Sequence, residues 1–311
     1  MKKFLKMFYL VLIVVFLYLP IGTLMVLSFN SGKSMNAWQG FSTKGYGEML
    51  RNQEIMEALG NTLTIALWAS VIATLAGVLA CIGLNAMSER KRSFYMGMNN
   101  IPLLNADIVT GISIMMSFLM FGISLSYGTV LFAHITFCIP YVILSVMPKF
   151  KQLENHTYEA ALDLGATPVY AFFKVVLPDI MPGIVSGFLL SFTMSVDDFV
   201  ITHFTRGAGI NTLSTLIYSQ VKIGVRPTLY ALSTVIFITV LLVLVIVNFL
   251  SGSRRGKGDY YSHKGGITTK KAIVLALVFL VCVLGLNRYA GSLVGAQDQG
   301  QVYVYCFGDY I

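Results

Sequence analysis

Charged residues are scarce in this chain. They make up 12% of it, while apolar residues make up 56%, and soluble domains usually carry about 25% charged residues. This composition excludes an ordinary soluble domain and indicates a membrane protein. A formal charge of +8 can indicate a protein that binds nucleic acid, but here the lysines and arginines stand in short loops between apolar runs. We therefore expect a lipid bilayer, and no nucleic acid, as the partner of this surface.

Cysteine is also rare, and the patterns of metal and nucleotide sites are missing. The four cysteines form neither a CxxC pair nor another metal-ligand spacing. Residues 30–34 (NSGKS) imitate the end of a phosphate-binding loop, but Leu27 stands where that loop requires glycine. We therefore expect no catalytic residue, no metal and no cofactor in this chain.

Six apolar runs before residue 251 are long enough to cross a bilayer, which takes about 20 residues. They predict an all-α integral membrane protein with a six-helix core. The first run follows a basic start, but no convincing cleavage site comes after it, so we expect an uncleaved span. The six runs are 8–27, 62–87, 101–121, 127–147, 182–204 and 229–250.

The basic residues predict the orientation of these spans. Most of the 22 lysines and arginines lie in loops on the same side as the N-terminus. By the positive-inside rule, that side is the cytoplasm. The loop that begins near Glu159 lies on this cytoplasmic side.

The composition changes after residue 250. Residues 251–271 are rich in Gly, Ser and charge and predict a cytoplasmic linker. Residues 272–296 hold a shorter apolar run, which suits a seventh helix that is either a membrane anchor or signal-like. Residues 297–311 alternate like the start of a β-strand. We therefore expect a membrane domain over residues 1–250 and a separate C-terminal region.

A polar segment separates the fourth and fifth runs, at residues 159–178 (EAALDLGATPVYAFFKVVLP). Gly165 stands where a helix C-cap stands, and Pro168 suits the first turn of a second helix. We expect that second helix to end at Leu177 and Pro178. The segment therefore predicts a pair of short helices with a break between them.

The spacing of this segment resembles the "EAA" loop of the membrane permeases of ABC importers. The matching residues are Glu159, Ala160, Ala161, Gly165, Leu177 and Pro178. The resemblance implies a type I importer permease whose loop couples to a cytoplasmic ATPase dimer, which binds the ATP and Mg. It also implies a second, homologous permease subunit and an extracytoplasmic substrate-binding protein or fused domain.

Three carboxylates, Asp107, Asp197 and Asp198, lie within predicted spans, where each costs about 2.5–3.5 kcal/mol at a helix centre. On a continuous helix, Ser195 and Thr202 share a face with Asp198. Adjacent carboxylates repel each other unless a cation or a proton intervenes. We therefore predict that these five residues line a path for a cationic cargo, with purely structural carboxylates as the alternative.

Two further stretches resemble polyamine transport proteins. Residues 191–204 (SFTMSVDDFVITHF) are similar to the C-type permeases of spermidine/putrescine importers, and residues 302–311 (VYVYCFGDYI) to the start of polyamine-binding proteins. The resemblance implies alternating access in a bacterial inner membrane, and a permease fused to the truncated start of a binding domain at 297–311. The alternatives are an importer permease for another small solute, or an ion-coupled secondary transporter or channel.

Overall fold

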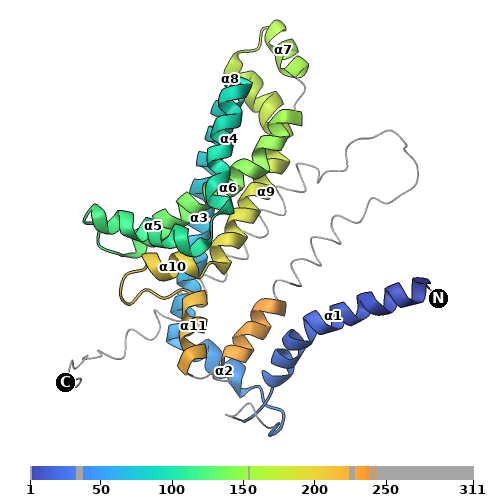
Figure 1. The fold of residues 1–311 in the computed structure, drawn as a ribbon, viewed down its shortest axis with the longest axis vertical. Helices are drawn as coiled ribbons and strands as arrows, with labels where there is room; N and C mark the ends of the chain where they lie inside the picture. The colour runs from blue at the N-terminus through green and yellow to red at the C-terminus, as the bar shows by residue number, and fades with distance from the viewer. Residues whose placement is uncertain (1, 33–37, 153–154, 224–227, 239–240, 242–311) are drawn as a thin grey trace. The chain divides into compact units, whose positions relative to one another are not determined.

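The computed structural model describes residues 2–32, 38–152, 155–223, 228–238 and 241, and this part is almost entirely helical (Figure 1). Long apolar runs become helices because a backbone in lipid has to satisfy its hydrogen bonds within its own segment. The predicted all-α class is confirmed. Among the described residues, the β-structure consists of an isolated bridge between Asn30 and Phe41.

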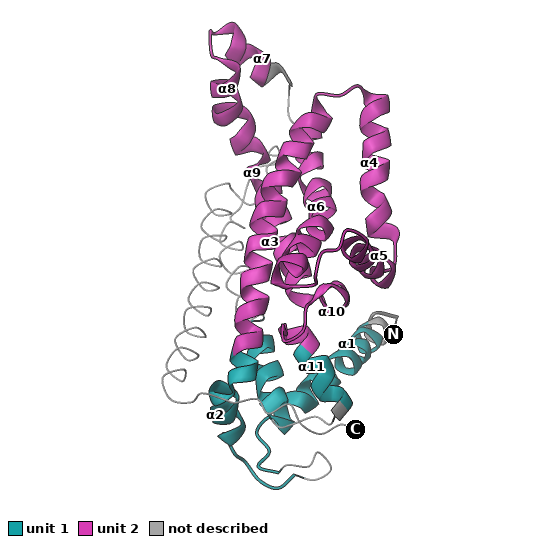
Figure 2. Cartoon of the chain, turned by 90° about the vertical axis from the view of Figure 1, so that its left-hand side faces the viewer, with its two compact units in different colours: residues 1–56, 216–256 teal, residues 57–215, 257–311 magenta. Residues whose placement is uncertain are grey.

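The chain divides into two compact units, residues 1–56 with 216–256 and residues 57–215 with 257–311 (Figure 2). The first unit contains α1 (Lys2–Leu27) and the short α2 (Lys44–Arg51). Between them, Phe29 stacks on Phe41 with ring centroids 5.2 Å apart. These aromatic contacts hold the connection between the two helices together.

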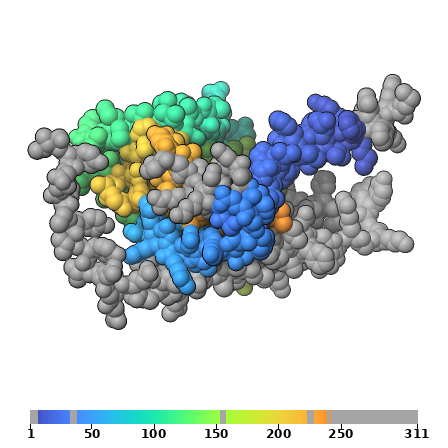
Figure 3. Space-filling model, turned by 90° about the horizontal axis from the view of Figure 1, so that it is seen from below, coloured from blue at the N-terminus to red at the C-terminus, as the bar shows by residue number. Residues whose placement is uncertain are grey.

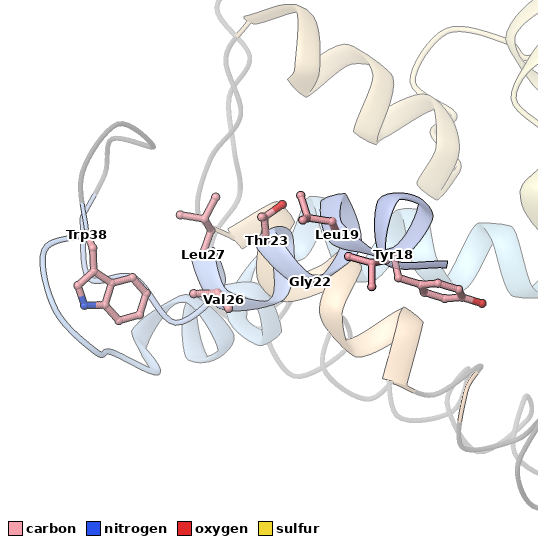
Figure 4. Close-up of a pocket in the computed structure, with 8 residues that line it drawn as sticks. Tyr18, Leu19, Gly22, Thr23, Val26, Leu27 and Trp38 are labelled. Carbon is pink, nitrogen blue, oxygen red and sulfur yellow. The ribbon is translucent and has the colours of Figure 1, made fainter. Parts of the chain in front are cut away.

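Helix α1 presents apolar side chains to its surroundings along most of its length, and Figure 3 shows it in dark blue as an uncovered row of side chains. A shallow apolar groove follows its C-terminal half and is shown in Figure 4. Such a surface is typical of a helix that lipid covers. The groove is lined by Val15, Tyr18, Leu19, Gly22, Thr23, Val26, Leu27 and Trp38.

The second unit holds most of the remaining helices. Helix α3 begins in the first unit and continues into the second. The elements are α3 (Gln53–Asn85), α4 (Glu89–Leu104), α5 (Asp107–Met120), α6 (Tyr127–Gln152), α7 (Asn155–Asp163), α8 (Pro168–Ala171), a π-helical turn (Phe172–Val176), α9 (Leu177–Asp197) and α10 (Val200–Thr205). Helix α11 (Leu213–Ile223) begins in the second unit and has most of its residues in the first.

The core of this unit is the contact between α6 and α9. On α9, Gly183, Gly187 and Ser191 are buried and recur every four residues, so they share one face. A Cβ at Gly187 would lie 3.4 Å from Val142 Cα and from Ser145 Cβ. Small residues at this spacing let two membrane helices approach closely, and α9 therefore packs closely along α6.

Two predicted spans are broken, so the prediction of continuous helices is wrong there. In the third run, α4 and α5 bend by 103° across residues 105–106 (Figure 1). In the fifth run, α9 ends at Asp197 and α10 begins at Val200. Asn105 and Asp198 are residue types whose side chains compete for backbone hydrogen bonds and so favour helix ends. Both breaks coincide with polar residues, Asn105 and Asp107 at the first and Asp197 and Asp198 at the second, although apolar residues continue on either side.

Within the described part of the chain, four helices are long and apolar enough to cross a membrane, or five if the bent pair is one span. The sixth predicted span is described as the short apolar helix Thr228–Ile238. The predictions for residues 251–271, 272–296 and 297–311 lie outside the described residues.

Gly77 tests the close packing against α6. A Cβ at Gly77 would lie 2.6 Å from Val142 Cγ1 and 2.9 Å from Val142 Cβ. We expect Gly77→Leu to lower the free energy of unfolding by about 1–3 kcal/mol, because overpacking strains a dense core. Gly83 lies on the same helix with no atom within 4 Å of such a Cβ, so Gly83→Leu is the matched control. Thermal unfolding in detergent measures both, and equal stability of the two variants would contradict this packing.

Candidate functional site

A buried histidine connects α6 to α9 and α10. The ring of His134 is 1% exposed. Its Nδ1 lies 2.7 Å from Ser195 Oγ, and its Nε2 lies 2.9 Å from Thr202 Oγ1. Nε2 is also 3.6 Å from Asp198 Oδ2. We call these four side chains, His134, Ser195, Asp198 and Thr202, the His134 cluster.

The carboxylate of Asp198 caps the short helix α10. Its Oδ1 accepts from the Ile201 N–H at 3.2 Å, and its Oδ2 accepts from the Thr202 N–H at 2.8 Å and from the Thr202 hydroxyl at 3.1 Å. The first N–H groups of a helix have no acceptor within the helix, so a side-chain acceptor there is stabilising. The Asp198 side chain is 7% exposed. The charge of Asp198 therefore stabilises the start of α10 inside the protein.

The structure brings Ser195, Asp198 and Thr202 together, but not as one face of a continuous helix. Asp198 lies in the break after α9 with an extended backbone, at φ −66° and ψ 124°. The three side chains meet because Ser195 and Thr202 both hydrogen-bond to the His134 ring and Thr202 also bonds to Asp198. Sequence reasoning missed His134. The available signal was an ionisable residue in the apolar run 127–147, because such residues in membrane spans are usually functional.

The two other carboxylates are exposed. Asp197 is the last residue of α9, and Asp107 is the first residue of α5. Neither carboxylate has a hydrogen bond or an ion pair with another described residue. Asp107 therefore begins a helix directly after a sharp bend and does not lie within a straight span.

Helix α5 packs directly against α10. A Cβ at Gly111 would lie 3.1 Å from the Phe204 ring and 3.6 Å from Ile201 Cα. The helix that begins with Asp107 is therefore in contact with the helix that Asp198 caps. The arrangement combines two exposed carboxylates with a third that is held internally.

Gly165 determines the conformation of the loop between α7 and α8, which precedes α9. Gly165 has φ +85°, a left-handed conformation that favours glycine. Its N–H donates to the Leu162 carbonyl at 2.9 Å, and the Ala166 N–H donates to the Ala161 carbonyl at 3.1 Å. These two bonds form the usual C-terminal cap of a helix. The predicted cap at Gly165 and the predicted helix start at Pro168 are both confirmed.

The second helix of this loop does not end at Leu177 and Pro178, as the sequence predicted. The chain continues through the π-helical turn Phe172–Val176 into α9, and Pro168–Asp197 forms a span of 30 residues. Pro178 is the second residue of α9 and thus an interior proline of this longer span. The helix therefore continues past this proline directly after the π-helical turn.

Apolar side chains are exposed around the loop. Leu164 is 89% exposed and Phe173 is 59% exposed, while Glu159 and Ala160 are also at the surface. A shallow hollow lies beside them, and exposed apolar patches of this kind mark docking surfaces. The hollow is lined by Ala161, Leu164, Gly165, Ala166, Thr167 and Tyr170.

The fold and the exposed loop define a multi-pass membrane component of a transporter, and comparison with known proteins gives the family. The model of the family "binding-protein-dependent transport system inner membrane component" matches residues 1–255. The chain therefore belongs to this family of importer permeases and is an integral protein of the bacterial inner membrane. Membership of this family implies ATPase and permease partners.

Relatives of known name are similar over most of the chain. It is 38% identical to the spermidine/putrescine permease PotC of Escherichia coli K12, over 78% of this chain and 92% of that protein. It is 40% identical to the putrescine permease PotI of the same strain, over 71% and 81%. It is 31% identical to the PotC homologue of Mycoplasma pneumoniae, over 79% and 90%.

A solved structure shares the fold. It is a bacterial ABC transporter involved in the import of the acidic polysaccharide alginate, with a TM-score of 0.63 at 15% identity, covering 82% of this chain and 98% of that one. The predicted type I permease fold is confirmed.

Substitutions of Asp197 and Asp198 test the internal role of Asp198. We expect Asp198→Leu to lower the free energy of unfolding by about 1–3 kcal/mol, because it leaves buried donors without an acceptor. Asp198→Asn keeps one acceptor and should cost less. Asp197→Leu is the control, and we expect a change within about 0.5 kcal/mol because this side chain is exposed. Thermal unfolding in detergent measures all three, and equal losses for Asp197→Leu and Asp198→Leu would refute the capping role.

Proposed function

We propose that this chain is the permease subunit of an ATP-driven importer of polyamines, the spermidine/putrescine class. The observation that carries the proposal is the similarity to permeases named for these cargoes along nearly their whole length. The chain would work by alternating access, with a second homologous permease subunit and an extracytoplasmic substrate-binding protein. ATP and Mg would be bound by a cytoplasmic ATPase dimer, and this chain would do no chemistry.

The loop of Glu159, Ala160, Ala161 and Gly165 is our proposed ATPase-docking surface. Its small residues and exposed apolar side chains suit a groove on the partner. Leu177 and Pro178, which belong to the same sequence pattern, lie further along at the start of α9. We propose that they pass movement of the loop into the membrane helix rather than contacting the ATPase.

The carboxylates are our proposed cargo path. A polyamine is a flexible chain with several protonated amines, so it needs spaced carboxylates for its charges and apolar or aromatic walls for its methylenes. Asp107 and Asp197 are exposed, whereas Asp198, Ser195 and Thr202 belong to the His134 cluster. We propose that all five residues line the cargo path, with Asp107 and Asp197 at the surface and the other three within the His134 cluster.

The C-terminal region keeps its sequence-based assignment as a proposal. Residues 251–271 would form a linker and residues 272–296 an anchor or signal-like helix. Residues 297–311 would begin an extracytoplasmic binding domain. Composition and the resemblance to polyamine-binding proteins support this assignment.

Gly165→Pro tests the docking loop. Proline cannot adopt φ +85° and lacks the N–H that donates to Leu162. We expect this variant, like Glu159→Lys, to reach the membrane but to lose ATPase binding and ATP-driven uptake. Gly122 caps α5 with the same left-handed geometry, at φ +68°, so Gly122→Pro is the matched control and should retain the ATPase. Co-purification measures binding, and normal binding and uptake in Gly165→Pro would refute the docking role.

Uptake of radiolabelled spermidine and putrescine tests the cargo, in cells that lack other polyamine importers. We expect Asp107→Asn and Asp197→Asn each to reduce uptake about tenfold or more, since each removes a charged partner of an amine. Asp179→Asn is the control, because it removes an exposed carboxylate at the opposite end of α9. Parental uptake rates in both cargo-path variants would disprove the acidic path. An absence of uptake by the parental transporter would disprove the polyamine assignment.

A further inference from the structure

Two adjacent carboxylates have opposite surroundings at the end of α9. Asp197 is exposed and has no hydrogen-bond or ion-pair partner among the described residues. The Asp198 side chain is 7% exposed and accepts from two backbone N–H groups and one hydroxyl. A carboxylate whose oxygens are already bonded gains little from a cargo amine, whereas an unpaired carboxylate near the membrane gains much.

The donors and acceptors of the His134 cluster can be assigned by counting protons. A hydroxyl has one proton to donate, and the Thr202 hydroxyl donates to Asp198 Oδ2. Thr202 Oγ1 therefore accepts from the Nε2–H of His134, 2.9 Å away. Neutral His134 then accepts at Nδ1 from the Ser195 hydroxyl, 2.7 Å away. The four groups form one directional chain from α9, through α6, to α10.

The histidine belongs to a fully buried part of α6. Its neighbours on α6, Val130, Ala133 and Cys138, are fully buried. The end of α9 and the start of α10 are joined by two residues in non-helical or transitional positions. The His134 ring is thus the point at which α6 is hydrogen-bonded to both the end of α9 and the start of α10.

We propose that His134 is a positioning residue of the cargo path: it holds Asp198 against α10, so that Asp197 is the carboxylate that contacts a cargo amine. This inference rests on the proposed polyamine import and assigns separate roles to the two carboxylates. Asp197 binds, and the His134 cluster keeps Asp197 pointing out of the protein. Without the His134 ring, Asp197 would keep its negative charge, but its carboxylate would no longer be held in the position that contacts a cargo amine.

The test measures KM and maximal rate of spermidine uptake by the complete transporter, normalised to the amount of folded complex. The variants are His134→Ala, His134→Gln, Asp197→Asn and the double variant His134→Ala with Asp197→Asn. We expect Asp197→Asn to raise KM about tenfold, the effect of losing one charge-assisted contact. His134→Ala should also raise KM, and His134→Gln should recover part of the loss, because its amide can still donate and accept.

The double variant should have about the KM of Asp197→Asn alone, because both changes remove the same contact. A purely structural histidine would lower the amount of folded complex and leave KM unchanged, and that result would overturn the inference. A parental KM for Asp197→Asn, or KM effects that multiply in the double variant, would also overturn it.

The parental transporter is measured first. If the parental transporter does not import polyamine, the proposed function is wrong. If it does import polyamine and the variants have the parental KM, the proposed function stands and only this inference is wrong.

Discussion

The break between α9 and α10 depends on the buried carboxylate of Asp198. In lipid there is no water to satisfy a free backbone N–H, so a helix can start within a membrane segment where the protein supplies an acceptor. Asp198 supplies it to Ile201 and Thr202. His134 then ties this cap to α6 through Thr202 and Ser195. A polar cluster thus permits an angular turn in what is otherwise an apolar span.

The same helix connects this cluster to the exposed loop of Gly165. The span Pro168–Asp197 passes through a π-helical turn without ending. Along the way, Gly183 and Gly187 bring it close to α6. Movement of the loop would therefore reach Asp197 along one continuous element. This geometry suits a permease that converts contact with an ATPase into a change at the cargo path.

The sequence predicted the all-α class and the cap at Gly165, because apolar composition and glycine each have a local physical meaning. It missed the breaks at residues 105–106 and after Asp197, because the carboxylates there were interpreted as members of continuous apolar spans, whereas Asn and Asp also favour helix ends. His134 was missed because its role depends on partners 61 and 68 residues away. The predicted end of the loop helix is wrong because Pro178 was interpreted as a helix stop, whereas the chain continues through the π-helical turn Phe172–Val176 into α9.

The coupling energy between His134 and Asp198 tests most directly whether the His134 cluster acts as one unit. Stability of the folded chain is measured for His134→Ala, Asp198→Ala and the double variant, with Asp197→Ala in place of Asp198→Ala as the control cycle. A shared network predicts that the double variant departs from additivity by at least about 1 kcal/mol, while the control cycle adds within about 0.5 kcal/mol. Additive losses for His134 and Asp198 would show that the cap and the histidine are independent, and would contradict the cluster.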